Sequence, residues 1–492
     1  MKILSGVDGA FLHLETPETP MHVASLHKFD LPARYQGSFH ANFKREIARR
    51  LHLAPIFTRK LAPMPLQFAN PVWVEEDEVD LEYHVPRVSL PRPGTQAQFE
   101  DCAARLHSEL LDRSHPLWRV GVIEGLETGQ VGLYIKVHHA VLDGLAGVLL
   151  ANALFDPTPR IRRIPRTPVP RAEHPGIAQL AAAALKHDAG QYFKLLRHLP
   201  DVVRTLGGMF GGAARDAPGK LGQNFTFGPK TPLNVPITGE RGFAAVSIPL
   251  ETLKQLAGAH AAKLNDVVLA LCSGALRLYL ARHGGIPRKP LIATMPISLR
   301  EAGNAEYTTQ AMLSLVNLQT RIADPVKRLH AIRDAAGAMK ALAQRARGVI
   351  PTDFPSIGAP WVLHSLAKLY GRSGIVRALP PLANVVISNV PGPQEPLYAV
   401  GARMATYWPM SITEHGVGLN ITVMSYAGAM GFGFTTARSA VPDAGELSAA
   451  LDAALRELVA VTGKRGGRTR PRRPSASSSV SRSRNLRSAA TS

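Results

Sequence analysis

The chain has little of several features that would assign it to a familiar class. Its 492 residues include only two cysteines, Cys102 and Cys272, which is too few for a disulfide framework or a cysteine metal site. No stretch reaches the roughly 18–20 uninterrupted apolar residues of a transmembrane helix; the best candidate, residues 131–155, contains a lysine, two histidines and an aspartate. The apolar run at the N-terminus is too short for a signal peptide. We therefore expect a cytoplasmic protein.

Two catalytic motifs are also missing. The chain has no Gly-x-Ser-x-Gly nucleophile elbow, the motif that presents the serine of many hydrolases. Its 18 histidines are scattered and include no His-Glu-x-x-His pair, the spacing that places two metal ligands on one helix face. We therefore expect neither a metal nor a cofactor.

Positive charge is in excess and is unevenly placed. The formal net charge is +20, and the segment from Lys464 to Ser492 contains nine Lys or Arg and no Asp or Glu. Its Ser, Arg and Pro content predicts a disordered tail. Such a tail can act as a solubilising segment, or it can adhere to anionic lipid headgroups at about 1 kcal/mol per cation. It has no interleaved aromatics or nucleic-acid motif, so we expect no nucleic-acid partner.

The length and patterning of the chain predict two core-forming α/β domains. We expect an N-terminal domain over residues 1–156, a linker over 157–235, a C-terminal domain over 236–463 and the tail over 464–492. Prolines alternate with arginines at the start of the linker, which excludes a helix interior there. Apolar residues at helical spacing in 177–210 indicate amphipathic helices that either cover a core or contact a membrane.

Several secondary-structure elements can be predicted from periodicity. Alternating apolar residues indicate a strand from Gln130 to His138, and short apolar runs indicate buried strands at 291–298 and 385–388. A hairpin is expected around residues 426–429. Residues 264–280 have a helical pattern, with Asn265 and Asp266 as its N-cap pair.

The segment His-His-Ala-Val-Leu-Asp-Gly, residues 138–144, carries the chemistry. If the strand alternation continues past residue 137, His139 lies on the buried face and His138 on the opposite one. A neutral imidazole just before a turn can accept a proton near neutral pH. A core histidine, with Asp143 as a helix cap and Gly144 in a turn, would explain each residue singly. The four fixed residues together favour a catalytic motif.

This segment resembles the HHxxxDG signature of CoA-dependent acyltransferases. The chain as a whole resembles the bacterial wax ester synthase/diacylglycerol acyltransferase family. The resemblance rests on blocks that occur in family order over almost the whole chain except the tail and much of the linker: LSGVDGAFL at 4–12, PMHV at 20–23, PLW at 116–118, NDVV at 265–268, MPISLR at 295–300, SNVPGP at 388–393 and GVGLN at 416–420.

The resemblance implies two chloramphenicol-acetyltransferase-like lobes that meet at a central active-site tunnel. Acyl-CoA would enter from one side, as a co-substrate, and diacylglycerol or a long-chain alcohol from the other. His139 would be the general base for direct attack of the alcohol on the thioester, and His138, on the opposite face, would be turned away from the reacting centre. Because such alcohols are insoluble in water, we expect peripheral contact with a membrane or lipid-droplet surface.

The resemblance also suggests roles for further residues. Asp143 would be structural, with Arg300 as its candidate partner, and Gly144 would complete the motif. The candidates for oxyanion stabilisation or substrate binding are Asn265, Ser298, Arg300, Ser388 and Asn389. The asparagines and serines among them can also be explained as helix caps or turn formers.

Three other functions compete with this interpretation. His138 and Asp143 match the His-x4-Asp spacing of glycerol-phosphate acyltransferases, but the Phe-Pro-Glu-Gly block of that family is missing. A free-standing condensation domain shares HHxxxDG, but it would normally lie beside a carrier domain. A catalytically inactive lipid-binding protein is the third, and the intact motif argues against it. The preferred acceptor, the acyl chain length and the oligomeric state stay open.

Overall fold

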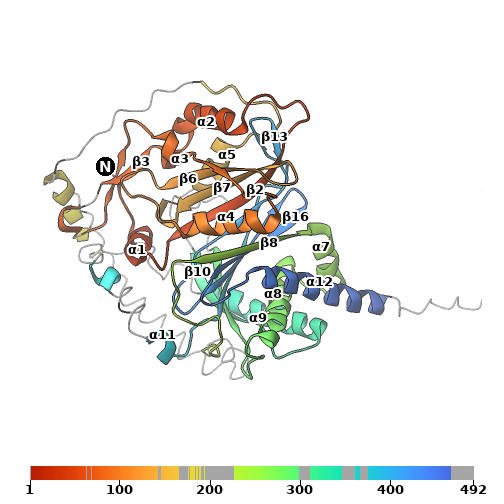
Figure 1. Ribbon diagram of the computed structural model, residues 1–492. Helices are drawn as coiled ribbons and strands as arrows, with labels where there is room; N and C mark the ends of the chain where they lie inside the picture. Colours follow the sequence, from red (N-terminus) through yellow and green to blue (C-terminus); the bar gives the residue numbers. More distant parts are fainter. Residues whose placement is uncertain are drawn as a thin grey trace, which may run out of the picture.

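The computed structural model describes residues 2–62, 64–67, 69–141, 146–165, 227–298, 311–345 and 375–466, together with short pieces between 176 and 193 and between 361 and 369. Within these residues the chain forms two α/β lobes, one above the other in Figure 1, each built on a large mixed sheet. The expected two-lobed α/β fold is confirmed. The tunnel between the lobes stays a prediction.

The N-terminal lobe is built on a seven-stranded sheet whose order is β12-β13-β2-β7-β6-β5, with β14 also paired to β2. Its strands from the first part of the chain are β2 (His22–Asp30), β5 (Arg87–Ser89), β6 (Trp118–Glu124) and β7 (Val131–His138). β7 lies in the middle of this sheet and is buried on both faces. The strand expected from Gln130 to His138 is therefore confirmed, and it ends inside the lobe.

Helices cover both faces of this sheet. Helices α2 (Phe39–Arg50) and α5 (Ala146–Leu154) lie on one face, where Phe43, Ile47 and Leu150 pack against β6 and β7. Helix α4 (Gln96–Ser108) covers the other face and lies between the lobes in Figure 1. The remaining elements of this lobe are α1 (Gly6–Leu14), α3 (Leu81–His84), the turns η1 (Leu51–Leu53), η2 (Pro55–Phe57), η3 (Pro65–Gln67) and η4 (His139–Val141), and a small sheet of β1 (Lys2–Ile3), β4 (Val72–Glu75) and β3 (Arg59–Ala62).

The C-terminal lobe is built on a six-stranded sheet in the order β10-β9-β11-β15-β16-β8. The strands are β8 (Arg241–Pro249), β9 (Ile292–Ser298), β10 (Ala311–Asn317), β11 (Val385–Val390), β15 (Leu419–Tyr426) and β16 (Ala429–Ala437). Helices α7 (Leu250–Ala259), α8 (Leu264–Arg282), α9 (Pro325–Arg345) and α12 (Gly445–Gly466) contribute to one apolar core with it, and α11 (Ile375–Ala378) precedes β11.

Local sequence explains the elements that were predicted here. β15 and β16 pair as the expected hairpin. Its two turn residues, Ala427 and Gly428, both have positive φ, as a two-residue hairpin turn of the favoured type requires. The N-cap prediction for α8 is wrong: Lys263 is the cap, and the Asp266 carboxylate accepts a hydrogen bond from its backbone N–H at 2.8 Å. Asn265 therefore lies inside the first turn.

The C-terminal domain contributes a segment to the N-terminal sheet, an arrangement that the expected domain limits did not include. β12 (Tyr398–Ala399), β13 (Ala402–Met404) and β14 (Trp408–Met410) lie in the sequence of the C-terminal domain but belong to the N-terminal sheet. There β13 and β14 pair with β2 and occupy its free edge. Gly431 and Gly433 of β16 permit this, because a Cβ at either residue would collide with a carbonyl oxygen of the segment leading into or forming β14.

The other expected domain limits stay predictions. α5 ends at Leu154 and β8 begins at Arg241. α12 continues to Gly466, past the expected start of the tail at Lys464, and residues 467–492 lie outside the described residues. Most of the predicted amphipathic region 177–210 also lies outside them, although Leu180 and Ala184 are buried against β4.

One helix of the described part, α8, is long and apolar enough to cross a membrane by length and composition alone. However, 72% of the window that passes this test is buried inside the protein. Its side chains form the centre of the C-terminal core, so packing inside the lobe accounts for its apolar composition.

Candidate active site

The parity argument extended the strand alternation to His139, but the strand ends one residue before it. β7 stops at His138, and His139 begins the 3-10 turn η4. The His138 N–H donates to the Leu117 carbonyl at 3.0 Å, and the His139 N–H donates to the Met21 carbonyl at 2.9 Å. The parity argument for the two rings is therefore wrong, because a 3-10 turn has no period of two. His138 is itself fully buried.

His139 lies against the first helix of the chain. Its ring stacks on Phe11 of α1, with 3.9 Å between ring centroids and 21° between ring planes. Its Nδ1 atom is buried and has no hydrogen-bond partner among the described residues. Burial, followed by the neighbouring His138, lowers the pKa of His139 from 6.5 to about 4. The ring is therefore neutral at pH 7 and can accept a proton.

Helix α1 is held over this turn by local and apolar contacts. The Ser5 hydroxyl caps the helix by accepting the Asp8 N–H at 3.1 Å. Leu4 and Leu12 pack with Ala140 of η4 in one small buried cluster. The N-terminal block of the chain is thus a wall of the site, a role that its sequence alone does not reveal.

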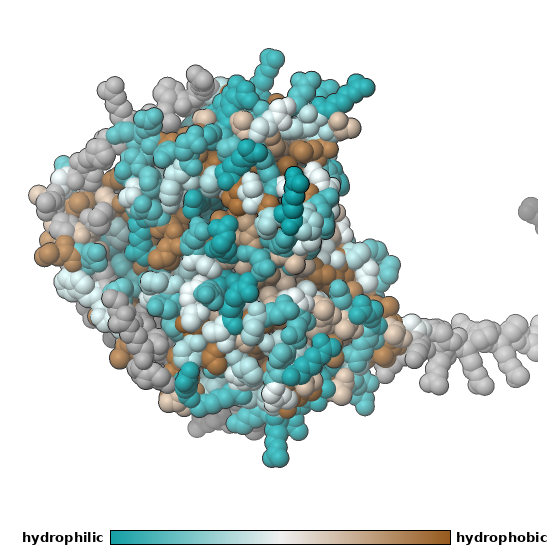
Figure 2. Space-filling view, viewed as in Figure 1, coloured by the Kyte–Doolittle hydropathy of each residue, from teal (hydrophilic) through white to brown (hydrophobic). Residues whose placement is uncertain are grey.

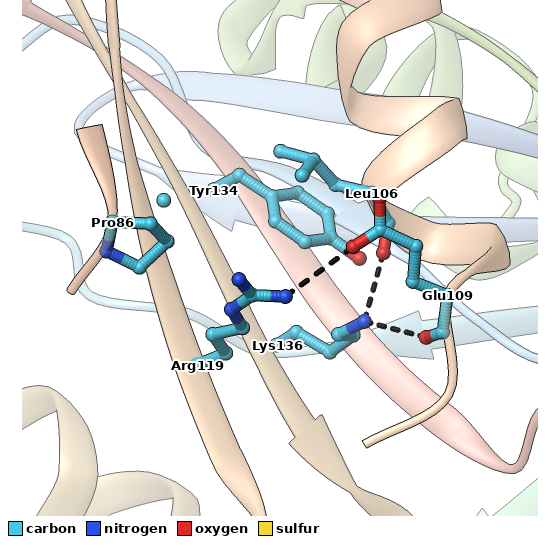
Figure 3. Close-up of a pocket in the computed structure, with 7 residues that line it drawn as sticks. Pro86, Leu106, Glu109, Arg119, Tyr134 and Lys136 are labelled. Carbon is cyan, nitrogen blue, oxygen red and sulfur yellow. Dashed lines mark hydrogen bonds and ion pairs between the residues drawn. The ribbon is translucent and has the colours of Figure 1, made fainter. Parts of the chain in front are cut away.

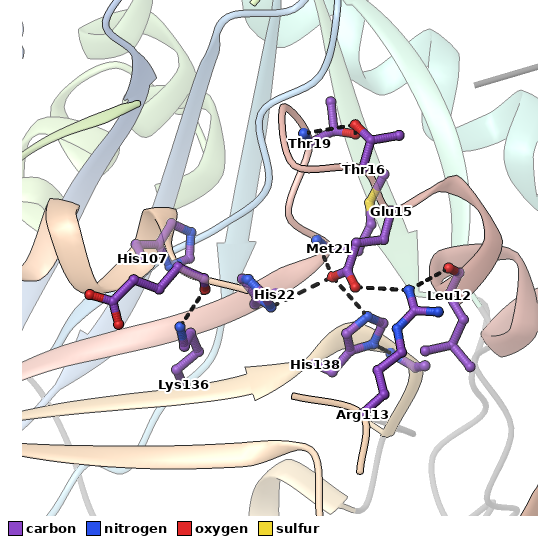
Figure 4. Close-up of polar contacts among 12 residues, drawn as sticks. Leu12, Glu15, Thr16, Thr19, Met21, His22, His107, Arg113, Lys136 and His138 are labelled. Atoms are coloured by element: carbon purple, nitrogen blue, oxygen red, sulfur yellow. Dashed lines mark hydrogen bonds and ion pairs between the residues drawn. The ribbon is translucent and has the colours of Figure 1, made fainter. Parts of the chain in front are cut away.

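His138 meets a buried carboxylate, Glu15, at the end of α1 (Figure 4). Glu15 Oε2 lies 3.2 Å from His138 Nε2 and accepts the Met21 N–H at 3.1 Å, while Oε1 accepts Arg113 Nη2 at 2.8 Å. Burial by itself would raise the pKa of Glu15, but the contact with His138 and the charge of Arg113 outweigh it, and the pKa is lowered. Glu15 is therefore ionised at neutral pH.

Further buried polar side chains follow on the same face of the sheet, beneath α4. His22 is fully buried, with Nδ1 3.8 Å from Glu15 Oε2, too far for a hydrogen bond. His107 Nδ1 and the Tyr134 hydroxyl are 2.8 Å apart. Lys136 Nζ donates to the carbonyl oxygens of Leu106 and Glu109 at 2.8 and 2.6 Å. Burial lowers the pKa of Lys136 to about 8.

Lys136 also lines a small pocket with Tyr134, Glu109 and Arg119 (Figure 3). Its volume is about 10 Å³, roughly the space that one water molecule needs. Arg119 and Glu109 form an ion pair at 3.3 Å beside it. A pocket of this size does not hold an acyl chain or an alcohol, so we assign it no substrate role.

Several predicted site residues lie outside the described part of the chain. They are Asp143, Gly144 and Arg300, and with them the proposed pairing of Asp143 with Arg300. Ser298 is the last residue of β9, but its side chain lies outside the described part of the chain. The roles expected for these four residues stay predictions.

The other candidates lie in the C-terminal lobe, where two of them meet. Asn389 of β11 donates its Nδ2 to Asn265 Oδ1 at 3.2 Å, and Asn265 Nδ2 lies 3.7 Å from Met295 Sδ. Ser388 precedes Asn389 on the strand, so its side chain points to the other face. Within the described residues, no hydrogen bond or ring contact joins these three to His139. An oxyanion role for them stays a prediction.

Sequence reasoning missed Glu15 and the role of Phe11. Glu15 lies between two of the blocks that carried the resemblance, and Phe11 lies in the first of them. A buried carboxylate gives no local signal, because its partner His138 is more than a hundred residues away in the chain. Only the antiparallel pairing of β2 with β7, which sets His22 opposite His138, brings them together.

The two lobes, the segment that the C-terminal domain adds to the N-terminal sheet and His139 in the turn after β7 fit an acyltransferase of the HHxxxDG type. Models of the wax ester synthase/diacylglycerol acyltransferase catalytic domain and of the WS/DGAT C-terminal domain match residues 4–268 and 309–459. The chain belongs to this family. It is 36% identical to a putative diacylglycerol O-acyltransferase of Mycobacterium tuberculosis H37Rv, over 94% of this chain and 100% of the relative.

Further relatives and solved structures agree. A probable diacylglycerol O-acyltransferase of the same strain is 34% identical, with the same coverage of both chains. The wax ester synthase/diacylglycerol acyltransferase of Marinobacter aquaeolei VT8 superposes with a TM-score of 0.67 at 29% identity, over 94% of this chain and 100% of that one. The starter condensation domain of rhizomide synthetase shares the fold, with a TM-score of 0.54 at 13% identity over 94% of each chain.

Proposed function

We propose that the protein transfers a fatty acyl group from acyl-CoA to the hydroxyl of diacylglycerol, of a long-chain alcohol, or of both, with His139 as the general base. The observation that carries the proposal is the setting of His139: its ring is half-buried at the start of η4 and stacked on Phe11, and its pKa is lowered to about 4. The relatives are named as diacylglycerol O-acyltransferases and the Marinobacter protein also as a wax ester synthase. These names supply the two candidate acceptors.

The reaction needs one base and no external proton. His139 takes the proton of the acceptor hydroxyl while the oxygen attacks the thioester carbonyl carbon. The C–S bond breaks as the tetrahedral intermediate collapses, and the imidazolium returns its proton to the CoA thiolate. Because burial lowers the pKa of His139 to about 4, the imidazolium is a strong acid and gives up this proton readily. The products are an ester and free CoA.

The oxyanion of the intermediate needs preorganised donors, each of which contributes about 3–4 kcal/mol in comparable sites. Asn265, Ser298, Ser388 and Asn389 remain the candidates. Asn265 and Asn389 already orient each other at 3.2 Å. No resident cofactor enters the scheme.

The test is transfer from radiolabelled palmitoyl-CoA with diacylglycerol and hexadecanol offered in competition. We expect labelled ester from wild type, and a loss of about 10²–10⁴-fold in kcat/KM for His139→Ala. His52→Ala, which removes another histidine of the same lobe in η1, is the matched control. A folded His139→Ala enzyme that keeps wild-type turnover would refute the role of His139. Absence of any ester from wild type would refute the function.

We also propose that the enzyme works at a lipid surface, where its acceptors are found. Leu66 in η3 is 88% exposed, and its carbonyl oxygen accepts the indole N–H of Trp361, which is 54% exposed, at 3.2 Å. Leu66 also adopts a left-handed backbone conformation with φ of 53°, which a leucine rarely adopts without cause. Figure 2 shows hydrophobic side chains at the left edge of the molecule. Tryptophan favours the membrane interface.

A further inference from the structure

We propose that Glu15 is a positioning residue for the base: its carboxylate fixes the orientation and tautomer of His138, and His138 fixes the backbone of the turn that carries His139. The proposal rests on the assignment of His139 as the base. It gives a role to a buried charge that the reaction scheme above does not use.

Glu15 is held too firmly to be an incidental charge. It directly follows α1, as its C-terminal cap residue, and its side chain is almost completely buried. Burying an ionised carboxylate is costly unless its oxygens are paired. Three groups from different parts of the lobe surround them. The backbone N–H of Met21 and the guanidinium of Arg113 donate hydrogen bonds, and Nε2 of His138 lies 3.2 Å away.

The contacts of His138 determine where its proton is. The backbone N–H of Ala140 donates to His138 Nδ1 at 3.0 Å, so Nδ1 must carry the lone pair. The proton of the ring is therefore on Nε2, the atom that faces Glu15 at 3.2 Å. Without this carboxylate, the buried Nε2 proton would lose the negative charge that lies 3.2 Å away. The other tautomer would place two N–H groups against each other at Ala140.

Ala140 follows His139 directly, so the contact at its N–H acts on the catalytic turn itself. Two polar contacts, Glu15 to His138 and His138 to Ala140, connect the carboxylate to this turn, and all three residues are buried. Helix α1 adds a second restraint, because Phe11 lies one helical turn before Glu15 and stacks on the His139 ring. One short helix thus restrains both the backbone and the ring of the base.

A purely structural role for Glu15 makes a different prediction. If the carboxylate only joined α1 to β2 through Met21 and to Arg113, its loss would reduce stability and leave turnover of the folded enzyme intact. If it acts through His138, its loss reduces kcat while the KM for acyl-CoA changes little. The losses of kcat caused by replacing Glu15 and by replacing His138 would then not multiply, because both changes interrupt the same series of contacts.

The variants Glu15→Gln, His138→Asn and the double variant separate these roles. Asparagine at 138 keeps an acceptor near the Ala140 N–H but is too short to reach Glu15. We expect Glu15→Gln to lower kcat by about 100-fold, with the KM for palmitoyl-CoA within about threefold of wild type. His138→Asn should have an effect of similar size, and adding Glu15→Gln to it should lower kcat by less than about threefold more.

Glu46→Gln is the matched control, because Glu46 is another buried carboxylate of the same lobe and pairs with Arg50 at 2.8 Å on α2. It should lower Tm without lowering kcat. Variants are compared only where circular dichroism and gel filtration match wild type. A folded Glu15→Gln enzyme with kcat within threefold of wild type, or effects that multiply in the double variant, would overturn the proposal. Activity in wild type and its loss in His139→Ala, measured alongside, show that such a failure concerns Glu15 alone.

Discussion

Removing the aromatic ring that covers His139 is expected to raise the pKa of this histidine and to move the acid limb of the pH–rate profile. Phe11 stacks on the imidazole with 3.9 Å between centroids, and burial is the largest cause that lowers the pKa of His139 from 6.5 to about 4. One pKa step equals about 1.4 kcal/mol, so burial and its neighbours disfavour the charged ring by about 3 kcal/mol. Phe11→Ala opens one face of the ring to water and should raise the pKa by about 1.

The assay is kcat/KM for a soluble short-chain alcohol between pH 4.5 and 8. The neutral ring is the active form, so activity is lost as the pH falls through the pKa of His139. At pH 5 a ring with a pKa of about 4 is still about 90% neutral, whereas one with a pKa of about 5 is half protonated. Phe11→Ala should therefore lose about half of its plateau activity at pH 5, and wild type little.

Phe11→Tyr keeps the stacked ring and should keep the wild-type acid limb. Reactions are started by a short pH jump, and native fluorescence is followed in parallel so that acid unfolding is not counted as loss of activity. An acid limb near 6.5 in wild type, or the same limb in wild type and Phe11→Ala, would refute the reasoning. In either case burial beneath Phe11 would not control the charge of His139.

Three further predictions concern stability and surface. Gly433→Ala places a methyl group against the Pro409 carbonyl oxygen and should lower the free energy of unfolding by about 1–3 kcal/mol. Gly463→Ala in α12 is the control, because a methyl group there meets no neighbouring atom, and it should not lower the free energy of unfolding. Equal Tm values for the two variants would contradict the close packing of β14 against β16. Burial lowers the pKa values of His27 and His107 to about 3 and of His84 to about 4. Above pH 6.5 these three rings are neutral in both the folded and the unfolded chain. Below pH 6.5 the unfolded chain binds up to three more protons at these rings than the folded protein does. The free energy of unfolding should therefore fall by up to about 1.4 kcal/mol per pH unit for each ring. A Tm that stays constant between pH 7.5 and 5 would exclude this. Leu66→Asp should weaken co-sedimentation with phosphatidylglycerol vesicles about tenfold, whereas Val459→Asp on α12, also an exposed apolar residue, should not. Equal binding of both variants would show that Leu66 does not contact the lipid surface.

Local sequence determined much of the fold because short-range patterns control it. The strand that ends at His138 and the hairpin at Ala427 and Gly428 follow from alternation and turn chemistry. The prediction for the start of α8 failed because two residues could act as a cap there, and Asp266 satisfies the Lys263 N–H from inside the helix instead. The addition of β12, β13 and β14 to the N-terminal sheet could not be predicted, because pairing with the edge of β2 depends on contacts between residues hundreds of positions apart.

The candidate site divides along the same line. The sequence by itself determined the family and predicted which residues would do the chemistry, because His139 and the family blocks are local and occur in a recognisable order. It did not determine the charge of His139, the tautomer of His138 or the end of the strand before them. The pKa of His139 depends on a ring from α1, the tautomer of His138 depends on Glu15, and the strand ends where η4 begins. Charge, tautomer and orientation of a buried group are set by whatever surrounds it, and only the tertiary structure decides what that is.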